Sequence, residues 1–178
     1  MTSIVRLDSV SAVYGDGHIH SLQSDEVVQN GQVGVAGNLL EGNREVRHFE
    51  QAADLASAKA VLVAHDEINY DEARRSMNTL NKFQIEPGTP FRAYDLHEND
   101  VFSVSADAID ALGDAPEVGN VVTMQSDSNK LAEAEDGGTA RFVGRIEALE
   151  QIGVPTVVGK AGLVGSVTDF VVIRVLSN

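Results

Sequence analysis

The chain has 178 residues, with 27 acidic and 13 basic side chains and a formal net charge of −14. This length is typical of one domain, and the ordinary apolar content excludes collagen-like and wholly disordered proteins. No segment approaches the roughly 18–20 uninterrupted apolar residues of a membrane-spanning helix. The absence of cysteine excludes disulfides, thiolate catalysis and thiolate zinc sites.

The charge is unevenly distributed along the sequence. Residues 94–136 hold eleven acidic residues and a single basic one, Lys130. Phosphate binding requires clustered lysine and arginine, so nucleic acid is not expected as a partner. A solvated, aggregation-resistant face is the simplest explanation of the acidic segment. A surface complementary to a basic partner is the alternative.

The N-terminal residues 1–24 show weak apolar alternation and then the turn-forming Gly15-Asp16-Gly17. The alternation predicts a strand with no local partner, which either joins the domain's sheet or reaches to another chain. We therefore expect an N-terminal arm or strand over 1–24 and a single β-rich domain over 25–178. The N-terminus lacks the basic segment and apolar run of a signal peptide, which predicts synthesis and folding in a cytoplasm.

The middle of the chain predicts several short strands. Asn30-Gly31 lies between two valine-rich segments and predicts a hairpin over 27–35. Further strands are expected over 45–49 and over the apolar run 59–65. Residues 69–77 lack glycine and proline and are compatible with a short helix.

After a break at 87–90, two-residue periodicity predicts more strands. Residues 106–112 are compatible with a short helix or a bulge. The strands are expected at these ranges: 91–96, 100–105, 120–125, 130–132, 140–149 and 168–176. Short strands separated by turns predict an all-β fold, mainly an antiparallel barrel or sandwich, with one or two short helices and an extended N-terminal arm.

Possible reactive groups are few. His18 and His20 would lie on the same side of a strand with Asp16 nearby, which is a usable start for a metal site. Surface histidines explain the pair more simply. The glycine-rich 159–165 has neither the phosphate-loop nor the dinucleotide-binding spacing and predicts a hairpin loop.

Paired carboxylates at 66–67 and 71–72 lie beside His65 and Tyr70. Acid–base catalysis would need two carboxylates held across a cleft, and acidic residues at a helix N-terminus explain them more simply. We expect no catalytic residues, no metal and no cofactor, and we expect that the protein is not an enzyme.

Several stretches together resemble small structural proteins of tailed bacteriophages, of the capsid decoration, cement or head-fibre-base type. The stretches with this similarity are Val33-Gly34-Val35-Ala36-Gly37, Gly42-Asn43-Arg44-Glu45-Val46-Arg47, Tyr70-Asp71-Glu72-Ala73, Glu86-Pro87-Gly88-Thr89-Pro90-Phe91-Arg92-Ala93-Tyr94, Asp100-Val101-Phe102-Ser103-Val104-Ser105, Ala140-Arg141-Phe142-Val143-Gly144 and Phe170-Val171-Val172-Ile173. The resemblance runs from about residue 30 to the end and consists of turn and strand patterns.

The resemblance implies a β module held on the outside of a virion capsid, with the major capsid protein and copies of itself as partners. A trimer is favoured because trimers fit the threefold sites of shells. No membrane and no nucleic acid are expected to bind. We expect shell or subunit contacts from the arm and from the apolar segment near 34–40, at Ile4, Val5, Leu7, Val10, Tyr14, Val35, Leu39 and Leu40.

Two other classes remain open. A phage adhesion or carbohydrate-binding module would need exposed aromatic platforms, and the chain has no tryptophan and only three tyrosines. A small hydrolase would use His18, His20 and the acids near Tyr70, with a bound transition metal.

Overall fold

A computed structural model of the chain describes residues 2–68, 80, 82–157 and 163–178. The described part consists mainly of strands, with 3₁₀ helices of three or four residues, η1 (Ser11–Tyr14), η2 (Asp16–His18) and η4 (Ala106–Ala108). The predicted all-β class is confirmed. The helix expected over 69–77 lies outside the described residues, and the one considered over 106–112 is η4 followed by a strand. No described helix is long and apolar enough to cross a membrane.

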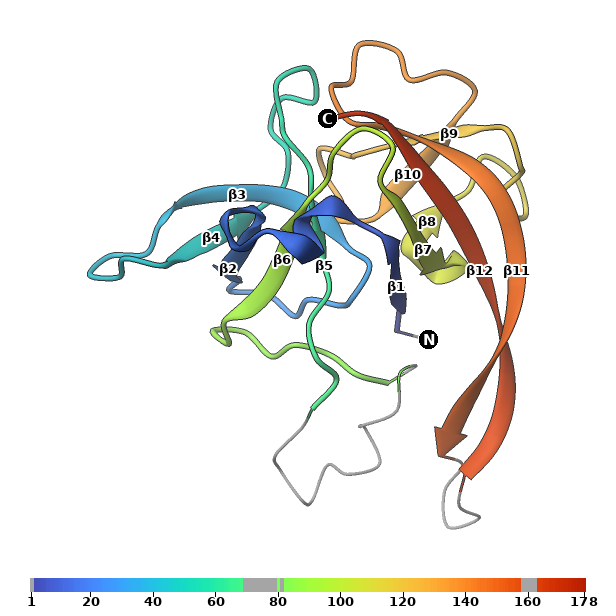
Figure 1. Cartoon of the computed structure of the whole chain (residues 1–178), viewed down its shortest axis with the longest axis horizontal. Helices are drawn as coiled ribbons and strands as arrows, with labels where there is room; N and C mark the ends of the chain where they lie inside the picture. The colour runs from blue at the N-terminus through green and yellow to red at the C-terminus, as the bar shows by residue number, and fades with distance from the viewer. Residues whose placement is uncertain (1, 69–79, 81, 158–162) are drawn as a thin grey trace.

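The strands form two units, a closed barrel and a seven-stranded sheet (Figure 1). The barrel order is β2-β4-β3-β5-β6, and its strands are β2 (Ile19–Gln23), β3 (Val33–Leu39), β4 (Val46–Glu50), β5 (Val61–Val63) and β6 (Phe91–Asp95). All its pairs are antiparallel except β2 with β4.

The seven-stranded sheet has the order β1-β7-β12-β11-β9-β10-β8. Its strands are β1 (Val5–Ser9), β7 (Val101–Ser105), β8 (Ile109–Asp110), β9 (Val121–Thr123), β10 (Leu131–Ala134), β11 (Val143–Val157) and β12 (Leu163–Ser177). Only β8 and β10 pair in parallel. The β11–β12 hairpin is far longer than the other strands, and one end extends beyond them (Figure 1).

Strand β5 is the wall shared by the two units. Its three residues are all buried, which explains the continuous apolar run in the sequence. Side chains alternate across a strand. Val61 and Val63 therefore pack in the barrel core with Phe49 and Phe91, whereas Leu62 packs in the larger core beneath the sheet.

The N-terminal segment is part of the fold. β1 pairs with β7 at the edge of the sheet, β2 closes the barrel, and Ile4 and Val10 are buried. The extended arm is therefore not confirmed, and the boundary expected at 24/25 falls directly after a barrel strand. The N-terminal strand was expected either to join the domain's own sheet or to reach to another chain, and it joins its own sheet.

Two turns join segments that do not pair with each other. Gly31 lies in a turn with φ +86°, as Asn30-Gly31 predicts, but Val28 pairs with Ile85 instead of with β3. Asn99 likewise turns the chain with φ 69°, yet β6 enters the barrel and β7 enters the sheet. Turn residues specify a reversal, and long-range burial decides which strands then pair.

Candidate functional site

The outer part of the β11–β12 hairpin extends beyond the rest of the fold (Figure 1). β12 pairs with β7 only over 170–174, and β11 pairs with β9 only over 143–145. Beyond these positions, among the described strands, residues 147–157 have no strand neighbour other than β12, and residues 163–169 have none other than β11. We call these two segments the ribbon. An isolated two-stranded ribbon is marginally stable in water, and its unpaired edges are templates for another chain.

The amino-acid composition of residues 151–168, which include the outer part of the ribbon, differs from that of the rest of the chain. Residues 151–168 contain no acidic residue and one charged residue, Lys160, in a protein of net charge −14. On the described part of the ribbon, Leu149 is 51% exposed and Val167 is 65% exposed. The outer ribbon thus lacks the negative charge that covers much of the body.

A recess of about 230 Å³ lies at the base of the ribbon, where η4 and the loop at 115–116 approach the hairpin. Apolar groups contribute much of its lining, including those of Ala106, Pro116, Leu149 and Phe170. Below it, Phe170 packs against Ile4 in a small buried cluster. The base of the ribbon is therefore anchored in the body, and a shallow apolar recess lies beside it.

The eight residues expected to make shell or subunit contacts divide into two groups. The interior of the chain uses five of them, Ile4, Val5, Leu7, Val10 and Val35, which are buried in or packed against its own clusters. The other three, Tyr14, Leu39 and Leu40, lie nearer the surface, with Tyr14 91% exposed. None of the eight lies in the ribbon, although the lack of acidic residues over 151–168 was visible in the sequence.

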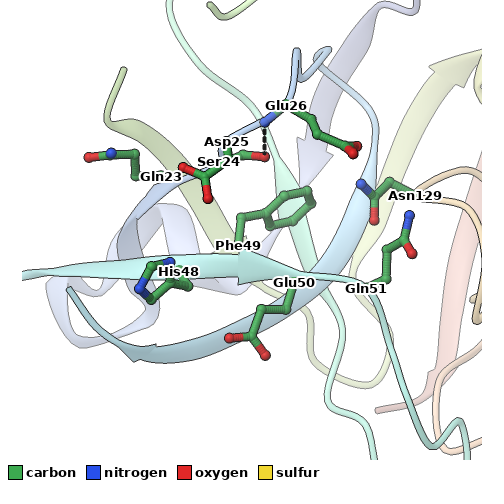
Figure 2. Close-up of a pocket in the computed structure, with 9 residues that line it drawn as sticks. All are labelled: Gln23, Ser24, Asp25, Glu26, His48, Phe49, Glu50, Gln51 and Asn129. Carbon is green, nitrogen blue, oxygen red and sulfur yellow. Dashed lines mark hydrogen bonds between the residues drawn. The ribbon is translucent and has the colours of Figure 1, made fainter. Parts of the chain in front are cut away.

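A polar hollow of about 320 Å³ lies on the barrel wall (Figure 2). It is lined by the turn after β2 and by β4, with His48 and Glu50 on one side and Asp25 and Glu26 on the other. The single hydrogen bond drawn among its nine residues joins the Glu26 amide to Ser24 Oγ, at 3.0 Å, and forms the turn (Figure 2). The ionisable groups point in different directions around an open surface.

A more convergent group lies where β2 and β6 pair. Opposite His20 in the ladder is Ala93, so Asp95 at the end of β6 lies beside the start of β2. Asp95 Oδ1 is 3.0 Å from His20 Nε2, and Asp95 Oδ2 is 2.9 Å from Lys59 Nζ and 3.5 Å from His18 Nδ1. His97 completes the cluster with its ring against that of His18.

The charge on Asp95 is held by these contacts. Burial of the carboxylate raises its pKa, but the hydrogen bonds from Lys59 and His20 outweigh that effect, and the pKa of Asp95 lies below its ordinary value. The sequence suggested His18 and His20 as a metal-binding pair without a third ligand. The additional side chains are Asp95 at the end of β6 and His97 two residues after it, and only the β2–β6 pairing brings them to His18 and His20.

The residues considered for a hydrolase do not form one group in the described structure. His65 and Glu67 surround Asn30, whose side chain bonds the His65 backbone at 2.8 and 2.9 Å and Glu67 Oε1 at 3.2 Å. Burial lowers the pKa of His65 and raises that of Glu67. His18 and His20 instead contact Asp95, and residues 70–72 lie outside the described part.

The acidic segment 94–136 has two structural roles. Eight of its acidic residues are exposed, whereas Asp95, Asp100 and Glu133 are buried. Burial raises the pKa of Glu133, but the amides of Glu117 and Leu112 and the side chain of Asn120 donate to it and lower that pKa overall. The segment is thus partly a solvated face and partly internal scaffolding.

Comparisons with protein-family models, with curated proteins and with solved structures found no match.

Proposed function

We propose that the protein is a structural component of a tailed-bacteriophage head that binds the outside of the capsid and stabilises the shell. The observation that carries the proposal is the ribbon, an anchored two-stranded projection with unpaired edges over 147–157 and 163–169. The resemblance of the turn and strand patterns to decoration and cement proteins supplies the class of partner.

Strand addition is the mode of binding that fits the ribbon. A segment of the major capsid protein pairs with one edge through main-chain hydrogen bonds, while apolar side chains enter the recess beside Leu149 and Phe170. Many copies on a symmetric lattice make a modest contact sufficient, because each bound copy ties neighbouring shell subunits together.

The remaining surface also supports this role. Free copies carry a net charge of −14, which opposes edge-to-edge association before a copy reaches the shell. Residues 151–168 of the hairpin hold no acidic residue and so add no negative charge at the proposed contact. A homotrimer is our prediction for the oligomeric state of the protein, and native mass spectrometry of the purified protein measures that state directly.

Quantitative mass spectrometry of gradient-purified phage particles from the source lysate tests the proposal. We expect a fixed ratio of this chain to the major capsid protein that persists through a second gradient. Absence of the chain from the particles, with the chain abundant in the soluble fraction, would overturn the proposed function.

A further inference from the structure

The cluster around Asp95 lies where the chain passes between the two units of the fold. The segment containing η1 and η2 joins β1 of the sheet to β2 of the barrel, and residues 96–100 join β6 of the barrel to β7 of the sheet. The two connections are bonded to each other, because Asp100 Oδ1 accepts from the Ser11 amide at 2.9 Å and from Ser11 Oγ at 2.5 Å. A ligand bound here would hold both connections.

The geometry of three side chains is that of a partly assembled metal site. His18, Asp95 and His97 each present one donor atom, and the three atoms lie within 4.8 Å of one another. The rings of His18 and His97 meet edge to face, with centroids 4.8 Å apart and an interplanar angle of 88°. The side chain of Asp95 is only 8% exposed, whereas that of His18 is 51% exposed, so solvent reaches the cluster from one side.

A second observation concerns His97 itself. Its Nδ1 atom is buried and has no hydrogen-bond partner. The nearest carboxylate oxygen described for it, Asp100 Oδ2, is 3.7 Å away and accepts instead from the His97 backbone amide at 2.9 Å. A carboxylate behind an imidazole is the arrangement that orients metal-bound histidines. A small movement of the His97 ring would bring Nδ1 into hydrogen-bonding range of Asp100.

We propose that His18, Asp95 and His97 bind one divalent transition-metal ion, with Zn²⁺ as the best match. Two imidazoles and one carboxylate, with water in the fourth position, are an established donor set for tetrahedral zinc. The ion clips the connection from β1 to β2 onto the connection from β6 to β7 and so fastens the barrel to the sheet. His20 keeps its 3.0 Å contact with Asp95 Oδ1 and orients the carboxylate.

Lys59 is the competitor for this site. Its ammonium lies 2.9 Å from Asp95 Oδ2, the same oxygen that His18 Nδ1 approaches at 3.5 Å. Zn²⁺ bound to that oxygen repels the ammonium, and the partly exposed Lys59 side chain has room to turn toward solvent. Removing the Lys59 ammonium should therefore strengthen metal binding. If Lys59 and Asp95 formed only a surface ion pair, with no metal site at Asp95, no such effect would be expected.

Calorimetric titration of the chelator-treated full chain with Zn²⁺ tests the proposal. We expect one ion per chain, at least tenfold weaker binding for His18→Ala and for His97→Ala, and tighter binding for Lys59→Ala. His48→Ala removes a histidine of the barrel outside the cluster and is the matched control, with unchanged affinity. Far-UV circular dichroism checks that each variant is folded.

Thermal unfolding gives an independent readout, because a ligand that binds only the folded state raises Tm. Zn²⁺ is expected to raise the Tm of the wild type and of His48→Ala and to leave that of His18→Ala unchanged. Equal zinc affinity for the wild type, His18→Ala and His97→Ala would overturn the proposal, as would the absence of stoichiometric binding to the wild type.

Discussion

The barrel and the ribbon handle their backbone hydrogen bonds in opposite ways. In the barrel each of the five described strands has a neighbour on both sides, so the ladder closes on itself, although residues 35–39 of β3 pair with β4 alone. In the ribbon, 147–157 lie beside β12 alone and 163–169 beside β11 alone, so both outer edges are unpaired among the described strands. The barrel is structurally complete within one chain, whereas the ribbon is the part that a partner would complete.

Shortening the ribbon should have the largest effect of the changes proposed here, because it removes most of the unpaired strand edges and leaves the barrel intact. Gln151 and Asp169 face each other in the ladder, so an Asn-Gly turn in place of residues 152–168 closes the hairpin in register. We expect particle binding to fall by at least about 100-fold, because most of the unpaired strand edge is removed and only the recess at the base of the ribbon remains. Co-sedimentation of the variant with particles lacking this chain measures the loss.

The shortened chain also supplies its own control. The barrel, its closed ladder and the core containing Leu62 are untouched by the change. A cooperative unfolding transition should therefore remain. Undiminished particle binding by the folded, shortened chain would contradict the contact role of the ribbon.

The next largest effect is expected on stability, from a truncation in β5, the strand shared by the barrel and the sheet. Leu62→Ala removes a fully buried side chain from β5, and such truncations cost about 2–5 kcal/mol. Urea unfolding of this variant, beside Leu176→Ala on the exposed end of β12, measures the difference. A loss below about 0.5 kcal/mol, the range of ordinary surface changes, would show that β5 does not join the two cores.

Glu133 tests the scaffolding role of the acidic segment. Glu133→Gln replaces a carboxylate that accepts from the amides of Leu112 and Glu117 and from Asn120, so a loss of about 1–3 kcal/mol is expected at neutral pH. The folded pKa of Glu133 lies below its ordinary 4.5, so its contribution is present above that value and is lost as the pH falls through the folded pKa.

Urea unfolding of both proteins at pH 7 and near pH 3 measures this dependence. The gap between the wild type and Glu133→Gln should shrink toward acid, because the protonated carboxyl no longer accepts in the same way. Glu117→Gln, at an exposed position nearby, is the control. A gap that is the same at both pH values would contradict the proposed role of the charge.

The smallest effect on stability is expected at the ribbon surface. Val167→Asp introduces a negative charge at a position that is 65% exposed, and it should change the free energy of unfolding by less than about 0.5 kcal/mol. Particle binding should nevertheless weaken at least tenfold. Val27→Asp makes the same change at an exposed position before the barrel strand β3 and should leave binding unaltered. Equal binding by both variants would argue against the ribbon.

The predictability of the fold from the sequence differs between elements for physical reasons. The apolar run around Val61–Val63 and the β-branched and aromatic residues of 168–176 predicted strands correctly, because both are typical of strands with a buried face. The pairing of Val28 with Ile85 and the fate of the N-terminal strand were not predictable, since they depend on contacts far apart in the sequence. Apolar alternation identifies a strand but does not identify its partner.

The same limit applies to the candidate sites. His18 and His20 drew attention through their spacing, but Asp95, His97 and Lys59 join them only through the pairing of β6 with β2 and β5. Ile4 and Val10 were expected to contact another chain and instead lie in this chain's own interior. In the sequence, an apolar side chain in an unpartnered strand is equally compatible with burial in its own core and with contact to another chain.

Hydrogen–deuterium exchange of the chain, free and bound to phage particles, tests the central claim most directly. Binding is expected to protect the amides of 147–157 and 163–169 from exchange, while the amides of β3 and β4 in the closed barrel exchange at the same rate in both states. Protection confined to the barrel, with the ribbon exchanging equally fast free and bound, would contradict it.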